Sequence, residues 1–476
     1  MTEDGYLIAL NADGVFEYAE LDANNSIVPL GVKASDISKR DWKENRFLKK
    51  LDKVSDFQSR LNNIVSDKIQ QKRQRDMNRA LAKYPTEGSP KSLVILVNFQ
   101  DLKFVSETPL ADFNDMLNQD GYSKNQATSS AREYFRASSF GQFDPEFVVV
   151  GPYDLPNDVS YYGANKGSNN DPNATQMIIH ACELADAAGL DFTEFDTDSN
   201  NILDNVFVYY AGHNEAEYGG ENTVWPHRGS VRNGTTIDGI KLQGYACTSE
   251  LKGAKGTTQC GIGTFCHEFS HVLGLPDFYV TDYSSSHKTP GDWDIMDSGS
   301  YLNDGNTPPT YSAHERFYLG WLTPEILNVA GDYELEELQK SNKAYIITSS
   351  GTHNLDGGNP NSNTYFLLEN RQKIGWDSYL PGHGLMISKT VYDEDDWYNN
   401  IPNNNKNSQG YDIIEADGKA PNGTFGKPGD LFPGTANVTS YTPYAEYPIT
   451  DIWEVDEVIG FEFMGGVTLP VDDVLG

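Results

Sequence analysis

The stretch "GTFCHEFSHVLGLPDFY", Gly263 to Tyr279, places two histidines four residues apart and a glutamate directly after the first of them. Residues four apart on an α-helix lie on one face, one turn apart. His267 and His271 can therefore offer two imidazole nitrogens to one zinc ion. Glu268 is predicted to be the general base that takes a proton from the attacking water.

The same stretch indicates where this helix ends. Gly274 suits the left-handed conformation at a helix C-terminus, and Pro276 prevents the helix from continuing. The chain must turn there, so Asp277 is predicted to swing back as the third zinc ligand. Glu315, further along the chain, is the alternative third ligand. The alternative to a metal site is an ordinary helix with one buried and one exposed histidine.

Longer motifs resemble the metzincin-type metallopeptidases, and most closely the secreted immune inhibitor A family. The resemblance is carried by "HEFSHVLGLPDFY", by "GDWDIMDSGSY" at 291–301 and by "PPTYSAHERFYLGWL" at 308–322. Upstream, "SSAREYFRASSFGQF", "DFTEFDTDSNNILDNVFVYYAG" and "VWPH" match in order, so it covers about residues 92–322. "YFLLENRQ" and "GDLFPG" extend it more weakly.

This resemblance implies a zinc-dependent endopeptidase that hydrolyses protein or peptide substrates, is exported from the cell, and is made as a zymogen with an N-terminal propeptide. Met296 would belong to a Met-turn beneath the zinc site; its alternative role is to fill the core. Two departures stand out. Metzincins usually have histidine where this chain has Asp277, and Tyr301 and Tyr311 do not match the spacing of their oxyanion-stabilising tyrosine.

The predicted fold class is α+β, with a metzincin-like zincin catalytic domain over residues 91–330. The buried-type strand "KSLVILVNFQD" opens this domain after the linker "YPTEGSP". Beyond residue 331, short strands between Asn- and Gly-rich loops predict a β-rich C-terminal region, residues 331–476. Helices are expected at about 126–138 and 173–187.

Residues 1–90 are predicted to be a propeptide-like region, with a hairpin over residues 5–30 and a long helix over 38–83. The segment 39–83 holds 14 basic and 6 acidic residues, a net charge of +8 in a chain whose total is −33. Such an arm would be drawn onto an acidic body, and an activating protease would cut near Arg73 and Arg75. The alternative is a solvated helix that only spaces two domains. No cysteine precedes Cys182, so no thiolate of this arm can bind the zinc.

The segment "DTDSNNILD" carries oxygen ligands in a pattern typical of a calcium loop. It lacks the glycine and glutamate of an EF-hand, and a polar turn without an ion is the alternative. The predicted calcium ligands are the side chains of four residues and one backbone carbonyl: Asp196, Asp198, Asn200, Asp204 and the carbonyl of Ile202.

Composition excludes other classes of protein. With 69 acidic and 36 basic side chains, the chain would repel a nucleic acid. The sequence contains no run of 18 apolar residues, so no transmembrane segment is predicted. The start "MTEDGYLIAL" has no export signal, so the predicted secreted or cell-surface location follows from the resemblance alone. The four cysteines are expected to be free and buried, with two disulfides as the alternative.

Two other functions fit parts of this pattern. One is a calcium-stabilised binding or adhesion module with a structural zinc ion. Glu268 counts against it, because a structural zinc site does not need that carboxylate. The other is a metallohydrolase that acts on glycans or small amides. Digestion of a protein substrate would exclude this second function. His227 and His314 are single histidines that are expected to be structural.

Overall fold

The computed structural model describes residues 84–466 except 166–170, 232–233, 283–286 and 419–425, together with short stretches between residues 2 and 51. The chain divides into two compact units, residues 1–81 and 82–476. The predicted boundaries at residues 90 and 330 stay predictions. The structure has helices and several sheets, so it is a mixed α and β fold.

The first unit contains a three-stranded antiparallel sheet, β1 (Ile8–Leu10), β2 (Phe16–Leu21) and β3 (Ile27–Lys33). The predicted hairpin is confirmed, with a third strand added. Helix α1 spans Trp42–Leu48, so it starts later than the helix predicted from residue 38. The rest of that predicted helix, residues 52–83, lies outside the described residues, as does the predicted cleavage site at Arg73 and Arg75.

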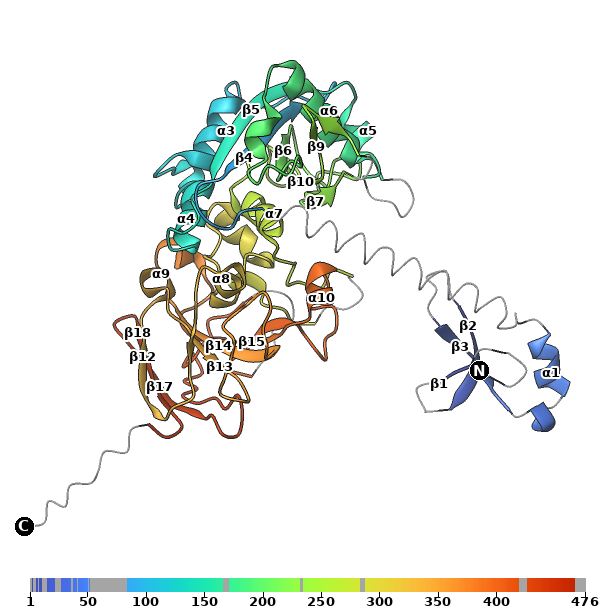
Figure 1. Ribbon diagram of the computed structural model, residues 1–476, viewed down its shortest axis with the longest axis vertical. Coiled ribbons are helices and arrows are strands. Elements are labelled where there is room, and N and C mark those ends of the chain that lie inside the picture. The colour runs from blue at the N-terminus through green and yellow to red at the C-terminus, as the bar shows by residue number, and fades with distance from the viewer. Residues whose placement is uncertain are drawn as a thin grey trace, which may run out of the picture. The chain divides into compact units, whose positions relative to one another are not determined.

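A five-stranded sheet organises the N-terminal half of the second unit (Figure 1). Its order is β5 (Glu146–Asp154), β4 (Lys91–Asn98), β6 (Val206–Tyr210), β10 (Gly244–Ser249) and β7 (His227–Ser230). The first four run parallel, and the edge strand β7 is antiparallel to β10. The predicted buried strand at β4 is confirmed, because residues 92–97 are all buried.

Helices cover both faces of this sheet. On one face, Leu96 and Phe207 pack with α3 (Pro109–Asn118), α4 (Ala131–Ser138) and α7 (Gly263–Leu273). On the other face, Ile95 and Val208 pack with α5 (Val159–Gly163) and α6 (Ala174–Ala187). The predicted helix at 173–187 is confirmed as α6. The helix predicted at 126–138 begins only at 131, because the Ser130 side chain caps it by accepting the N–H of Glu133.

The C-terminal region is rich in β-strands, as its sequence predicts. One sheet has the order β11 (Glu325–Ile326), β13 (Tyr345–Ile347), β14 (Thr364–Arg371), β15 (Gly384–Val391) and β16 (Tyr411–Ile413). A second has the order β12 (Gly331–Leu335), β18 (Val458–Phe463) and β17 (Ile449–Val455). Phe366 and Leu368 of β14 face the second sheet, whereas Tyr365 and Leu367 face α8 (Ala313–Leu319) and α9 (Leu338–Ser341).

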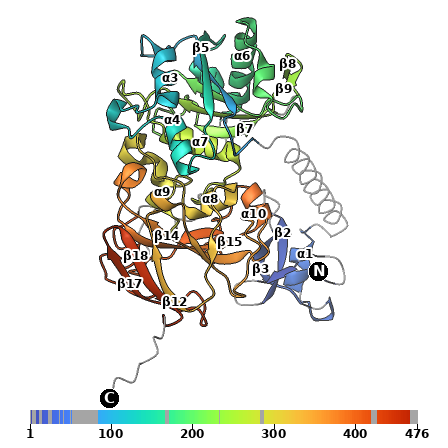
Figure 2. The same ribbon diagram turned by 60° about the vertical axis from the view of Figure 1, so that its left-hand side comes forward.

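Helix α7 lies between the five-stranded sheet and α8 in both views (Figures 1 and 2). Phe265 packs against Phe147 and Phe207, with ring centroids 4.9 and 4.5 Å apart. At the start of the helix, a Cβ on Gly263 would lie 1.9 Å from the carbonyl oxygen of Ser300, so only glycine allows this approach. These contacts fix both the position and the rotation of α7.

Two further expectations concern the whole chain. All four cysteines are free, and three of them are buried, so the disulfide alternative is wrong. Among the described residues, no helix combines the length and the apolar character that crossing a lipid bilayer requires.

Candidate active site

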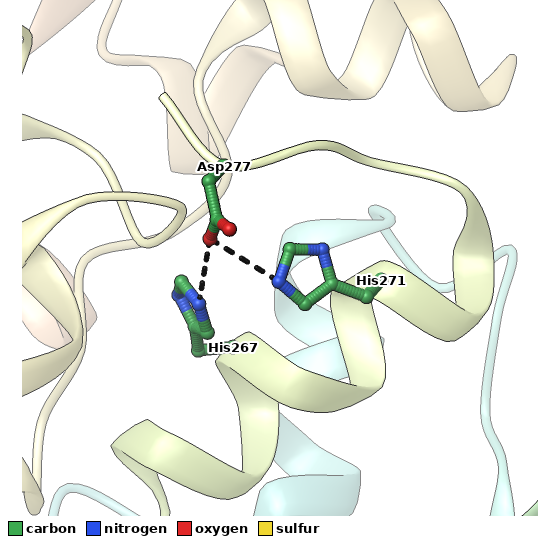
Figure 3. Close-up of side chains that lie close together, drawn as sticks. All are labelled: His267, His271 and Asp277. Carbon is green, nitrogen blue, oxygen red and sulfur yellow. Dashed lines mark ion pairs between the residues drawn. The ribbon is translucent and has the colours of Figure 1, made fainter. Parts of the chain in front are cut away.

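Three side chains from the opening motif meet at one point (Figure 3). His267 and His271 project from α7, and Asp277 approaches them from the segment that follows the helix. The Asp277 Oδ1 atom lies 3.1 Å from Nε2 of His267 and 3.2 Å from Nε2 of His271. All three residues offer a ligand atom within 4.8 Å of the others.

The second nitrogen of each imidazole is held by the backbone. Nδ1 of His267 lies 2.8 Å from the carbonyl oxygen of Ile295, and Nδ1 of His271 lies 2.8 Å from that of Leu275. A carbonyl oxygen can only accept a hydrogen bond, so both Nδ1 atoms carry the proton. In the neutral imidazoles both Nε2 atoms then present a lone pair to Asp277.

This arrangement fits a metal ion. Asp277 Oδ1 is buried and makes no hydrogen bond, although it faces two Nε2 atoms that in neutral histidine are also acceptors. Three lone pairs that face one another repel unless a cation lies between them. Ligands placed tetrahedrally at 2.0–2.1 Å from one zinc ion lie about 3.3 Å from each other. The two distances to Asp277 are close to that spacing.

Electrostatics indicate the same preference for positive charge. Burial lowers the pKa of His267, but the nearby carboxylate of Asp277 outweighs this effect and raises the pKa to about 9. Burial raises the pKa of Asp277, but the charges of both histidines hold it well below its usual range. The cluster therefore stabilises added positive charge, which either a proton or a metal cation can supply.

Glu268 lies beside these residues with only 6% of its surface exposed. Burial raises the pKa of its carboxyl group, and the charges of His267 and His271 lower it. A carboxylate with a raised pKa is a stronger proton acceptor than an exposed one. The carboxylate of Glu268 is not among the three grouped ligand atoms.

The turn after α7 brings Asp277 to the histidines. Gly274 has a φ of 105°, in the left-handed region, and its N–H bonds to the carbonyl of His271. The N–H of Leu275 bonds to the carbonyl of Ser270, which completes the helix C-cap. The predicted helix end at Gly274 is confirmed.

Replacing Gly274 with alanine should lower the free energy of unfolding by about 1–2 kcal/mol, because a side chain in the left-handed region is strained. The nearest atom to an added Cβ is 3.8 Å away, so the cost is conformational rather than a clash. We also expect faster loss of metal to a chelator, since the strain moves the segment that carries Asp277. Denaturant unfolding and chelator kinetics would measure the two effects.

Gly189 provides the matched control for this change. It has a φ of 94° after α6, and nothing lies within 4 Å of an added Cβ. Gly189→Ala should destabilise the chain by a similar amount and leave metal release unchanged. Equal metal release from the two variants would contradict the assigned role of the Gly274 turn.

Met296 is fully buried in the loop that supports His267. Its carbonyl accepts the N–H of Phe278 at 2.9 Å, and its N–H donates to the carboxylate of Asp294 at 2.8 Å. The neighbouring Ile295 supplies the carbonyl that holds His267. This loop therefore connects the imidazole of one histidine to the segment that carries Asp277.

Glu315, the alternative third ligand, is fully buried and caps α8. Its Oε2 atom accepts the N–H of Ser312 at 2.6 Å, and the Ser312 side chain accepts the N–H of Glu315. It does not belong to the group formed by the two histidines and Asp277. Tyr311 is fully buried and hydrogen-bonded to Ser270, and Tyr301 is half exposed. Neither observation assigns the oxyanion-stabilising role to one of these tyrosines.

The predicted calcium loop brings three carboxylates together, those of Asp196, Asp198 and Asp204. Asp204 accepts the N–H and the hydroxyl of Thr197, and the side-chain oxygen of Asn200 accepts the N–H of Ile202. These bonds also satisfy the loop as a polar turn without an ion. Calcium binding there stays a prediction.

His227 and His314 both lie in structural surroundings. His227 bonds to the carbonyl of Trp225 at 2.7 Å and to the hydroxyl of Tyr245 at 2.9 Å. His314 is fully buried, stacks on Tyr411 with ring centroids 4.3 Å apart, and has its pKa lowered to about 3 by burial. It is therefore neutral.

One residue at the site had no signal in the sequence. Asn400, which follows α10 (Glu394–Tyr398) in the C-terminal region, hydrogen-bonds directly to Asp277. It belongs to an asparagine-rich segment, "NNIPNNNKN", which by composition is typical of a loop. A motif search cannot find a partner 123 residues away from the ligand it contacts.

Comparison with known families agrees with this site. Residues 80–321, just over half of the chain, match the catalytic domain of the immune inhibitor A peptidases, family M6. The chain belongs to this peptidase family. The match includes α7, Asp277 and the loop around Met296, so the three clustered side chains lie within the catalytic domain.

Individual relatives are distant. The chain is 24% identical over 285 residues to the pre-pro-metalloprotease PrtV of Vibrio cholerae, over 50% of this chain and 31% of the relative. It is 24% identical over 272 residues to immune inhibitor A of Bacillus thuringiensis, over 48% and 39% of the two chains. A protein of Arthroderma benhamiae named as a secreted metallopeptidase is 23% identical over 356 residues, 60% and 50%. The matched part of the chain thus covers between 31% and 50% of the length of these relatives.

Proposed function

We propose that this protein is a secreted zinc endopeptidase that hydrolyses protein substrates. The observation that carries the proposal is the convergence of His267, His271 and Asp277 on one point, with both imidazoles oriented by backbone carbonyls. Glu268 adds a buried carboxylate beside them, which a purely structural metal site does not need. Membership of the M6 peptidases supports the same reaction class.

In this proposal, the two histidines and Asp277 hold the zinc ion. When bound, zinc supplies Lewis-acid chemistry that polarises the scissile carbonyl and makes the attacking water more acidic. Glu268 accepts the proton of that water and then donates it to the nitrogen of the leaving amine. Ile295 and Leu275 keep the imidazoles in the tautomer that presents Nε2, through their carbonyl oxygens.

The five-stranded sheet has an edge strand next to α7 that is suited to binding an extended peptide. Strand β7 is the last strand of its sheet, pairs only with β10 among the described strands, and contacts α7. An edge strand offers main-chain groups that can pair with an extended chain whatever its sequence. This supports a protein or peptide substrate over a glycan or a small amide.

The proposal predicts one zinc ion per chain. Once any propeptide is removed, it also predicts casein hydrolysis that stops when a chelator removes the metal. Elemental analysis of the purified protein and a fluorescent casein assay, with and without zinc added back, would measure both. Zinc-loaded protein that cleaves neither casein nor peptides after residues 1–90 have been cut away would favour the adhesion module with a structural zinc ion.

Latency is a separate part of the proposal. The basic charge of the segment 39–83 suggests that residues 1–90 hold the enzyme inactive until they are cut away. Limited trypsin that removes this region should then raise the rate of casein hydrolysis several-fold. An unchanged rate, with the zinc still bound, would show that the region is a spacer and would leave the proposed peptidase reaction intact.

A further inference from the structure

Asn400 makes a paired contact with Asp277. Its amide Nδ2 donates to Oδ2 of Asp277 at 2.5 Å, and its Oδ1 accepts the backbone N–H of Asp277 at 2.6 Å. A backbone N–H can only donate, so it fixes which end of the amide is the oxygen and places the NH₂ group at the carboxylate. Oδ2 of Asp277 is thereby engaged, and Oδ1 is left facing the two histidines.

We propose that Asn400 is a positioning residue of the metal site, which keeps Asp277 a one-oxygen ligand by holding its second oxygen. The inference rests on the proposed zinc function. Partners that orient metal ligands typically contribute 10- to 100-fold to metal affinity. The backbone orients the two histidines, but Asp277 receives its support from a side chain of the C-terminal region.

The chemistry of an amide suits this role. A lysine or arginine at position 400 would neutralise the carboxylate and compete with the cation for it. An asparagine amide is neutral, so it orients Asp277 and leaves the full negative charge for the metal. It also donates and accepts at once, which allows it to hold the backbone and the side chain of Asp277 together.

The backbone at Asn400 also requires a special residue. Its φ is 61°, in the left-handed region, where asparagine is tolerated better than most side chains. Its carbonyl accepts the hydroxyl of Thr281 at 2.8 Å. Main chain and side chain of Asn400 therefore bind the same segment at two places.

Neighbouring asparagines extend this attachment. The Asn403 side chain donates to the carbonyl of Phe278 at 2.7 Å, and the side-chain oxygen of Asn404 accepts the N–H of Thr281 at 2.8 Å. The segment 400–404 is thus joined to 277–281 along its length. The C-terminal region therefore supplies an outer layer of the metal site.

The test is Asn400→Gly, which removes the amide and keeps a residue that accepts positive φ. We expect the dissociation constant for zinc to rise about 10- to 100-fold and zinc to pass faster to a colorimetric chelator. Asn437→Gly is the matched control, because Asn437 also has positive φ, 52°, and is exposed. That control should bind zinc as the parent does.

A double-mutant cycle separates positioning from general stability. In an Asp277→Ala background, Asn400→Gly should change zinc affinity by less than about twofold, because its partner is gone. Equal losses in both backgrounds, or parental affinity in Asn400→Gly, would overturn the inference. A parent chain that binds no zinc would instead overturn the proposed function and this inference with it.

A second variant covers the case in which Asn400→Gly does not fold. Asn400→Asp keeps the size and the tolerance for positive φ but turns a second carboxylate oxygen toward Oδ2 of Asp277. Zinc binding should again weaken by at least about tenfold. Parental zinc affinity in a folded Asn400→Asp protein would overturn the inference.

Discussion

Glu268→Gln should retain one zinc ion per chain and hydrolyse casein at least about a hundredfold more slowly than the parent, the lower end of the effect of a general acid–base group. Glutamine has nearly the same shape as glutamate but cannot accept the proton of the attacking water. The metal ligands are unchanged by this substitution, so zinc content and rate should separate. Elemental analysis and steady-state kinetics on the same preparation would measure both.

The control for this variant is Glu183→Gln, which makes the same chemical change on the exposed surface of α6. It should leave zinc content and rate at the parental values. Casein hydrolysis by Glu268→Gln at the parental rate would show that another group takes the proton. Loss of zinc from Glu268→Gln would place Glu268 among the ligands.

Asp277→Ala should lower zinc affinity by more than about a hundredfold, because loss of a ligand should exceed the 10- to 100-fold effect of an outer partner. Glu315→Gln should bind zinc as the parent does. Glutamine keeps an acceptor oxygen for the N–H of Ser312, so the cap of α8 survives the change. Competition with a chelator of known affinity would measure both variants.

The comparison decides between the two candidate third ligands. Folding of each variant can be checked by circular dichroism in the metal-free state, so that a loss of zinc is not mistaken for a loss of structure. Weakened zinc binding in Glu315→Gln together with parental binding in Asp277→Ala would move the third ligand to Glu315.

Local sequence predicted that the two histidines and Asp277 lie close together. The spacing of His267 and His271 required only a helix, and Gly274 with Pro276 required a turn after it. Both are short-range consequences of backbone geometry. The position of Asp277 beside the histidines follows from that turn, and the structure places it there.

The rest of the site depends on contacts that local rules do not encode. The carbonyl of Ile295 reaches His267 because the loop around Met296 folds under α7, and Asn400 reaches Asp277 from beyond β15. Strand patterns predicted that the C-terminal region is rich in β-strands. They could not predict which loop of that region meets the metal site, since hydrophobic periodicity does not specify how sheets and loops dock.

Helix boundaries show a similar limit. The helical pattern at about 126–138 predicted α4, but the start at 131 depends on one hydrogen bond that the Ser130 side chain accepts from the N–H of Glu133. Several serines and threonines in "ATSSAREYF" could serve as a cap. Tertiary packing of Tyr134 and Phe135 selects among them, because both rings are fully buried.

The most direct test of the account is X-ray diffraction from crystals of the zinc-loaded protein, recorded on both sides of the zinc absorption edge. The account predicts one strong anomalous peak, about 2.0–2.2 Å from Nε2 of His267, Nε2 of His271 and Oδ1 of Asp277. Oδ2 of Asp277 should stay hydrogen-bonded to Asn400. A peak bound by Glu315, or no peak between the two histidines, would contradict the account.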